Sequence, residues 1–196
     1  MTRSGGRVRI SRDKLVGVVV ALACLAFSAI GLEVNDVPDF TYIDGVRGQS
    51  VRIEQAELTV GDVDVGSRLV DRGRVQAETR GMFVVVHARL EVPGPRKVYL
   101  NSAYLLTGDR TYNLWSSNSL AADPGFAEEQ DLVFEVDPAQ IDDLSLEIWA
   151  SSTVHGYYQR ARVHLGITGD NAEQWRQAAR GRELQPAGSG TTEALP

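Results

Sequence analysis

The sequence predicts an all-β domain, an antiparallel immunoglobulin-like β-sandwich over residues 51–168, preceded by one N-terminal transmembrane helix and followed by one short helix and a flexible tail. Three observations carry this prediction: an uncharged apolar run behind a basic segment, repeated two-residue alternation of apolar side chains, and turn residues between the alternating stretches. Alternation with period two is typical of half-buried strands, and many short strands without helical periodicity between them favour a sandwich.

The N-terminal region predicts a signal anchor with the transmembrane helix over 15–34. Residues 1–14 carry five Lys or Arg, and the stretch from Leu15 to Leu32 has no charge. Eighteen helical residues measure about 27 Å, close to the hydrocarbon thickness of a bilayer. Because acidic residues follow the span, the positive-inside rule keeps residues 1–14 in the cytoplasm and places the C-terminal domain outside, as a single-pass protein of the cell membrane.

Two alternatives to a retained anchor remain. A signal peptide would be cut at a small-x-small site, which Ala26-Phe27-Ser28 offers weakly. A lipoprotein would be modified at Cys24, but eight further residues of the apolar run follow this cysteine where a polar tether is expected. The apolar character that continues to Leu32 favours retention of the helix.

Small residues in the span follow a helical spacing and form one narrow stripe. Close packing of helices in lipid relies on such small residues, so the stripe predicts contact with another membrane helix, either in a homodimer or in a partner membrane protein. Small residues are also common in membrane spans, which is the alternative explanation. The stripe consists of Gly17, Ala21, Cys24, Ser28 and Gly31.

Residues 35–50 mix Pro, Gly and Asp with isolated aromatics and predict a linker. The clearest strands beyond it are 81–92, 132–136, 144–150 and 158–167, with weaker ones at 51–60, 73–79, 98–108 and 111–115. Turn signals such as Gly61-Asp62, Gly108-Asp109 and Pro124-Gly125 lie between them. The expected inward side chains are Met82, Val84, Val86, Ala88, Leu90, Val92, Leu132, Phe134, Val136, Leu144, Leu146, Ile148, Ala150, Ala161, Val163, Leu165 and Ile167.

One helix is expected over 170–181. The run Asp170 to Glu173 reads as a capping box, and Gly181 stands where a helix should stop. The last segment, 182–196, is rich in Gly, Ser, Thr and Pro and predicts a disordered tail.

Two stretches resemble a known family. "GMFVVVHARLEV" and, some forty residues later, "DPGFAEEQDLVFEVD" are similar to the telokin-like immunoglobulin-like domains of bacterial extracytoplasmic proteins, a domain family of unknown function related to a mycobacterial immunoprotective antigen. The shared motifs are Gly81 with Phe83-Val84-Val85, then Pro124-Gly125, then Leu132-Val133-Phe134. The resemblance implies a sandwich over about residues 51–167 and no catalytic residues.

Composition and motifs point away from catalysis and from nucleic acid. The net charge is −6, whereas a nucleic-acid phosphate backbone demands a basic face. The single cysteine, Cys24, lies in the apolar run, which leaves the globular part without disulfides or thiol chemistry. His87 and His164 fall on outward positions of strands, where an ordinary solvated histidine is expected. We expect no enzyme and no cofactor.

The remaining lead is a set of aromatic side chains in or near turns, which are frequent anchors of recognition surfaces. Trp149 and Tyr104 are expected instead to fill the space between the sheets. The sequence therefore predicts a non-enzymatic, membrane-anchored extracytoplasmic module that binds a protein or cell-envelope component as an accessory subunit. The alternative is a small-ligand or calcium receptor that uses the carboxylates of Asp62, Asp64, Glu128, Glu129 and Asp131. The candidate partner surface comprises Tyr112, Trp115, Tyr157 and Tyr158.

Overall fold

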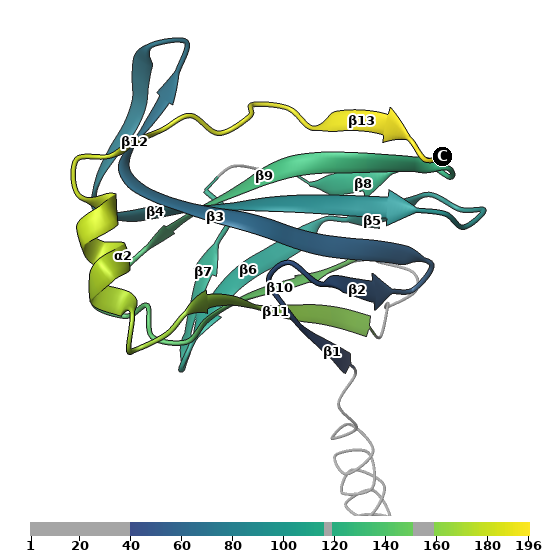
Figure 1. Ribbon diagram of the computed structural model, residues 1–196, viewed down its shortest axis with the longest axis horizontal. Coiled ribbons are helices and arrows are strands. Elements are labelled where there is room, and N and C mark those ends of the chain that lie inside the picture. The colour runs from purple at the N-terminus through teal and green to yellow at the C-terminus, as the bar shows by residue number, and fades with distance from the viewer. Residues whose placement is uncertain (1–39, 116–118, 151–158) are drawn as a thin grey trace, which may run out of the picture. The chain divides into compact units, whose positions relative to one another are not determined.

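The computed structural model describes residues 40–115, 119–150 and 159–196, and it is drawn in Figure 1. The predicted membrane span, its stripe of small residues, and Tyr157 and Tyr158 lie outside the described residues. Among the residues that are described, no helix is long and apolar enough to cross a membrane.

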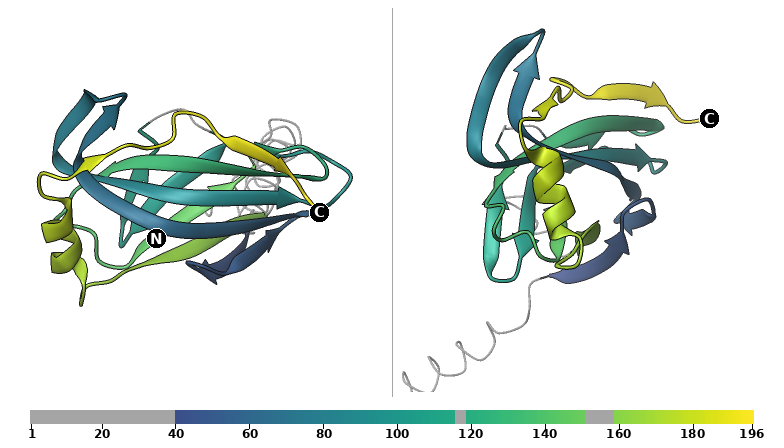
Figure 2. Two further views of the ribbon diagram at one scale, coloured as in Figure 1. Left: turned by 45° about the horizontal axis from the view of Figure 1, so that its top comes forward. Right: turned by 60° about the vertical axis from the view of Figure 1, so that its left-hand side comes forward.

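Two sheets pack face to face, which confirms a β-sandwich (Figures 1 and 2). A two-stranded pair, β5 (Val98–Leu100) with β8 (Leu120–Ala122), accompanies them. The first sheet, sheet A, has the order β1 (Thr41–Val46), β11 (Gln159–Ile167), β10 (Leu144–Trp149), β6 (Ser102–Thr107) and β7 (Arg110–Asn113). The second, sheet B, has the order β12 (Glu183–Leu184), β3 (Ala56–Asp71), β4 (Arg74–Val92), β9 (Phe126–Val136) and β13 (Thr191–Ala194), with β2 (Ser50–Ile53) beside β3.

The core between the sheets consists of the side chains that the alternation predicts. All seventeen expected inward residues of β4, β9, β10 and β11 and their flanks are buried, and they belong to one apolar cluster. Most strand pairs are antiparallel, as expected, but β1 runs parallel to β11 and β12 runs parallel to β3. Both parallel pairs involve strands from segments that were not expected to be strands.

The longest hairpin joins β3 and β4 and extends beyond the rest of sheet B (Figure 1). Its two turn residues, Arg72 and Gly73, both have positive φ, at 49° and 74°. Such a pair is typical of a type I′ turn, whose twist matches that of the flanking strands. Gly61-Asp62, in contrast, is not a turn: it lies inside β3 where the register shifts between Val60 and Val63, so this turn prediction was wrong. A bulge absorbs the extra residues there without ending the strand.

The prediction of a linker over residues 35–50 was wrong for residues 40–50, the part that the structure describes. Thr41–Val46 forms β1 along the edge of sheet A, and Ser50 begins β2 in sheet B, so the chain changes sheets within four residues. Gly45 permits this crossing, because a Cβ atom there would lie 2.2 Å from Cγ2 of Val51. Backbone hydrogen bonds to β11 hold β1, and they require no apolar alternation.

The predicted helix is present as α2 (Ala172–Ala179) at one end of the sandwich (Figure 2). The capping box is wrong: the side chain of Asn171 accepts a hydrogen bond from the Thr168 amide at 2.9 Å and does not cap α2. This contact fixes the turn before the helix instead. Gly181 has φ +67°, a conformation that favours glycine, and the helix stops before it as predicted.

The C-terminal segment 182–196 forms β12 and β13 and is not a disordered tail. It runs back along the outer face of sheet B (Figures 1 and 2). The reason is a second apolar cluster on that face, where Leu184 packs over Phe83, Val85 and Val133. These side chains alternate outward on their strands, and Leu184 shields part of their surface from water.

Candidate functional site

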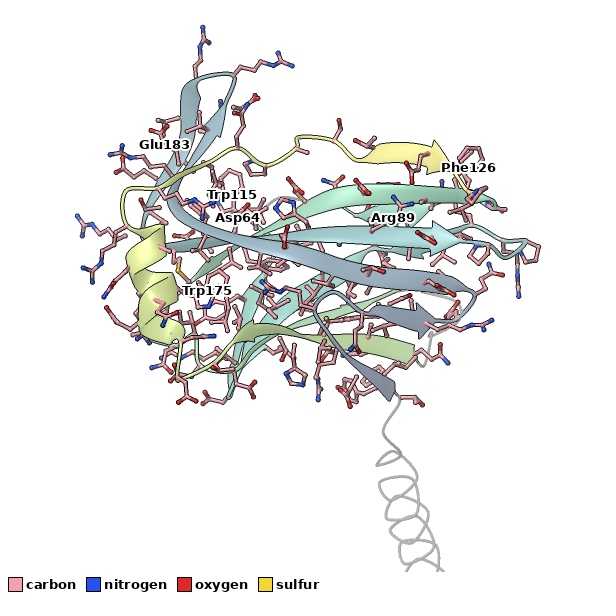
Figure 3. All side chains as sticks on the ribbon, in the orientation of Figure 1. Asp64, Arg89, Trp115, Phe126, Trp175 and Glu183 are labelled. Atoms are coloured by element: carbon pink, nitrogen blue, oxygen red, sulfur yellow. The ribbon has the colours of Figure 1, made fainter. Side chains whose placement is uncertain are left out.

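The two predicted partner residues that the structure describes, Tyr112 and Trp115, do not form one surface. Tyr112 is half-buried and packs against the core between the sheets, and its hydroxyl group has no hydrogen-bond partner among the described residues. Trp115 is 46% exposed and lies edge-on to Phe83 with ring centroids 6.0 Å apart, over the outer face of sheet B (Figure 3). Tyr112 and Trp115 therefore belong to different parts of the sandwich.

A denser group of aromatic and cationic side chains covers the outer face of sheet A. The guanidinium carbon of Arg160 lies 3.4 Å from the ring centroid of Phe40 and 4.0 Å from that of Trp149. Trp149 in turn stacks on Tyr104 at 5.2 Å. We call this group the aromatic–arginine face, and it consists of Phe40, Tyr42, Tyr104, Glu147, Trp149, Arg160 and Arg162.

The register of sheet A brings these residues together. Tyr42 of β1 lies opposite Arg160 of β11, and Glu147 of β10 lies between Arg162 of β11 and Tyr104 of β6. Cross-strand neighbours on one face have side chains in contact, so the face extends across four strands. The expectation that Trp149 and Tyr104 fill the core was wrong, because both alternate outward, opposite to the buried positions of β10 and β6.

Glu147 holds the two arginines in place. Its side chain is only 6% exposed, and its carboxylate accepts hydrogen bonds from Arg160 at 2.7 Å and from Arg162 at 3.4 Å. The Arg162 guanidinium also lies 4.0 Å from the ring centroid of Tyr42. One carboxylate against two guanidinium groups leaves these three side chains with a net positive charge, and Asp44 of β1 lies opposite Arg162 on the same side of the sheet. Tyr42 and Phe40 remain 41% and 38% exposed, so the rim is open to solvent.

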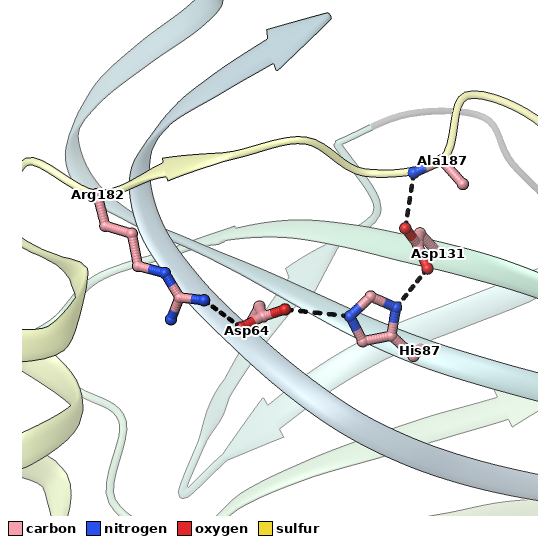
Figure 4. A network of polar contacts seen from close by, with 5 residues as sticks. All are labelled: Asp64, His87, Asp131, Arg182 and Ala187. Atoms are coloured by element: carbon pink, nitrogen blue, oxygen red, sulfur yellow. Dashed lines mark hydrogen bonds and ion pairs between the residues drawn. The ribbon is translucent and has the colours of Figure 1, made fainter.

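The outer face of sheet B carries a different polar group, shown in Figure 4. Nδ1 of His87 lies 2.6 Å from a carboxylate oxygen of Asp131, and Nε2 lies 3.3 Å from Asp64. Both carboxylates also bind the C-terminal segment: Asp64 pairs with Arg182, and Asp131 accepts a hydrogen bond from the Ala187 amide at 2.7 Å. The expectation of an ordinary solvated histidine at position 87 was wrong, since the three residues clamp the segment 182–187 to the sheet.

These contacts shift three pKa values. The hydrogen bond that His87 donates to Asp131 is the main reason why the pKa of His87 rises to about 9, and it outweighs the opposing effect of burial. Burial is the largest single effect on Asp64 and on Asp131 and would raise their pKa values. The contacts with His87, together with those of Arg182 to Asp64 and of the Ala187 amide to Asp131, outweigh burial, so both pKa values are lowered. His87 is therefore protonated at neutral pH. A histidine that is already protonated cannot act as a general base at that pH.

The pKa shifts predict a pH-dependent attachment of the C-terminal segment. Because the pKa of His87 is raised on folding, its contribution to stability is complete below about pH 6.5 and disappears as the pH rises through about 9. The side chain is 39% exposed, so solvent screening limits the effect to about 1 kcal/mol. We expect His87→Gln to abolish this loss in urea unfolding between pH 6.5 and 9. His164→Gln, on the outer face of sheet A, should keep it; the same slope in both variants would contradict the assignment.

Three of the five carboxylates named for calcium, those of Asp64, Glu129 and Asp131, are engaged by the chain's own cations. Glu129 pairs with Arg89 at 2.7 Å, and the ring of His87 lies between Asp64 and Asp131. Over the described ranges, no group of three or more His, Cys, Asp or Glu side chains is arranged to hold a metal ion.

No protein-family model matches the chain, and no curated protein matches its sequence. Among solved structures, the chain is similar to an uncharacterised β-sandwich protein from Clostridium difficile 630 with 8% sequence identity. The similarity covers 64% of this chain and 95% of that chain, with a TM-score of 0.42.

Proposed function

We propose that the protein is a non-enzymatic, membrane-anchored binding module whose β-sandwich lies outside the cytoplasm and docks a protein or cell-envelope component. The aromatic–arginine face is the observation that carries this proposal. Trp, Tyr and Arg are the residue types that dominate binding energy at protein interfaces. Here they are held by stacking and by the buried carboxylate of Glu147, so little side-chain entropy would be lost on binding.

The location of the module rests on the charge order of the sequence. The basic residues 1–14 precede the uncharged run, and β1 of the sandwich begins at Thr41, soon after it. We extend the proposal to the membrane helix: Gly17, Ala21, Cys24, Ser28 and Gly31 would contact a second copy or a partner membrane protein, which oxidative crosslinking through Cys24 in membranes would test. An immunoglobulin-like relationship, and membership of the telokin-like family, remain part of this proposal.

Tyr42→Ser tests the face with little risk to the fold, because the ring is 41% exposed and its contact with Arg162 is worth only about 0.5–1 kcal/mol. We expect the variant to lose about tenfold or more in partner recovery when the full chain is crosslinked in membranes and purified. Its melting temperature should change little.

Tyr99→Ser is the matched control. Tyr99 is 48% exposed and lies on β5, which pairs with β8 and not with sheet A, so the same change removes a ring of similar exposure that is not part of the aromatic–arginine face. Partner recovery by this variant should equal that of the unchanged chain. Equal recovery with Tyr42→Ser, or equal loss with both variants, would overturn the assignment of the face.

A small-ligand receptor is the second candidate function, and one observation favours it. A cavity of about 600 Å³ lies beside α2, within the size range of small-molecule sites.

A further inference from the structure

The cavity beside α2 lies at the end of the sandwich opposite to Phe126, and Trp175 on α2 marks this end in Figure 3. Its walls come from four parts of the chain: Ser67 of β3, Thr79–Met82 of β4, Pro138 and Ala139 after β9, and the C-terminal half of α2 with the residues that follow. The cavity therefore exists only when the helix is docked on sheet B. It is separate from the aromatic–arginine face of sheet A.

The charged lining of this cavity is entirely cationic. Arg80, Arg176 and Arg180 line it, and no Asp or Glu does, although the chain as a whole has a net charge of −6. Arg80 and Arg180 form no ion pair with any described residue. Arg180 still interacts at longer range with Glu173, whose pKa its charge helps to lower. Three positive groups at one cavity, two of them without an ion pair, favour the binding of an anion.

Arg176 is held in a fixed position at the wall. Its Nε donates a hydrogen bond to the carbonyl oxygen of Pro138 at 2.6 Å, and its side chain is 27% exposed. Its terminal nitrogens lie 3.4 Å from Glu173 and 3.7 Å from Asp142, two carboxylates that are themselves largely exposed to water. Such exposed pairs are weak, so a bound anion can compete for the guanidinium group.

The hydroxyl groups of the lining differ in what they can offer a ligand. The hydroxyl of Ser67 accepts a hydrogen bond from the Gly181 amide at 3.1 Å, which leaves its own proton available as a donor. Thr79 donates its proton to Glu135 and accepts from the Gly81 amide, so it is already satisfied. Among the neutral side chains that line the cavity in the described residues, only Ser67 can therefore still donate a hydrogen bond to a ligand.

The rest of the lining is apolar. Met82 and Ala179 are buried beneath it, at 1% and 5% exposure, and Pro138 and Ala139 close one side. Bare inorganic anions gain nothing from an apolar wall, whereas an organic anion buries its hydrocarbon part against it. The charge and the wall together select a ligand with both features.

We propose that this cavity binds an organic anion, with a carboxylate or phosphate group held by Arg80, Arg176, Arg180 and Ser67 and with an apolar body against Met82 and Ala179. The ligand could come from a free metabolite or from the head of a single-chain lipid, since both present the same chemistry. This activity is independent of the docking function proposed for sheet A.

The test uses the full chain in nanodiscs of zwitterionic lipid and titration calorimetry with octyl phosphate, octanoate, inorganic phosphate and octanol. We expect octyl phosphate and octanoate to bind and the other two to bind at least about tenfold more weakly, since a charge-assisted hydrogen bond is worth about 1.5–3 kcal/mol. A phosphate-headed lysolipid as a fifth probe separates the sources: tighter binding than octyl phosphate assigns a lipid, and weaker binding assigns a free metabolite. Either result supports the site.

Arg80→Gln combined with Arg180→Gln should weaken octyl phosphate binding about tenfold or more, and Arg74→Gln is the matched control. Arg74 is an exposed arginine on the same strand as Arg80, it has no ion pair to a described residue, and it does not line the cavity. Equal binding by the double variant and by the unchanged chain would overturn the proposal, because partition into the nanodisc would then explain the signal. Inorganic phosphate or octanol binding as tightly as octyl phosphate would overturn it as well.

Discussion

Phe134→Ala is expected to destabilise the sandwich by about 3–5 kcal/mol, the usual cost of removing a fully buried aromatic ring. Phe134 has no exposed surface, lies opposite Val84 in sheet B, and forms a bridge to Leu114 beyond the end of β7. The cavity left by the ring would therefore loosen the contact between the two sheets. Equilibrium urea unfolding followed by circular dichroism measures the loss.

Phe126→Ala provides the control for this experiment. Phe126 begins the same strand, β9, but its side chain is 40% exposed. The same truncation there should cost no more than about 0.5 kcal/mol, as for most surface changes. Equal losses for the two variants would show that the core does not lie between β9 and sheet A.

The core was predictable from the sequence because burial on one side of a strand leaves a period of two. Leu132, Phe134 and Val136 show it in β9, and the same spacing in β10 and β11 identifies the facing sheet. The pattern fails on β4, where Phe83 and Val85 are buried as well as Val84. Part of their cover comes from Leu184, a residue about a hundred positions away that no local pattern connects to them, and Phe83 also contacts Trp115.

The strands that were missed are those that backbone hydrogen bonds hold. All four side chains of β13 are exposed, so no apolar alternation marks it, and its pairing with β9 is the main sign of its structure. β1 has only half-buried residues on its inner side. Such edge strands follow the sheet that they join, and their own composition, with Gly, Asp and Thr, resembles that of loops.

The polar groups were partly visible in the sequence. Alternation placed His87 outward correctly, but its partners Asp64 and Asp131 lie 23 and 44 residues away, and only the register of β3, β4 and β9 brings them into contact. Trp149 could have been placed on the aromatic–arginine face, since it alternates outward with Glu147. The size of the indole ring favoured a position in the core. In the structure, stacking against Arg160 and Tyr104 shields much of this ring from water on the outer face of sheet A.

Gly66→Ala is expected to detach the C-terminal segment while the sandwich stays folded. A Cβ atom at this position of β3 would lie 2.6 Å from Cγ of Leu184 and 2.7 Å from the carbonyl oxygen of Arg182. The leucine could rotate, but the carbonyl oxygen is fixed because it accepts hydrogen bonds from the amides of Ser67 and Arg68 at 3.0 and 3.3 Å. Relief of the clash therefore requires the backbone of the segment to move, at a cost of about 1–3 kcal/mol.

Hydrogen exchange reports this detachment directly. In the folded chain the amide of Ala187 donates a hydrogen bond to Asp131. In Gly66→Ala this amide should exchange about 10- to 100-fold faster, because a loss of about 1–3 kcal/mol raises the population of the open state by that factor. Amides of Phe134 and Val84 in the core should keep their protection. Gly61→Ala on the same strand is the control, since its Cβ would meet only the His87 carbonyl oxygen at an ordinary 3.6 Å. Two outcomes would contradict this prediction: unchanged exchange at Ala187 in Gly66→Ala, or equal acceleration in both variants. Either would mean that the close contact of Arg182 and Leu184 with β3 does not hold the segment. The contacts of His87, Asp64 and Asp131 would then have to hold it alone.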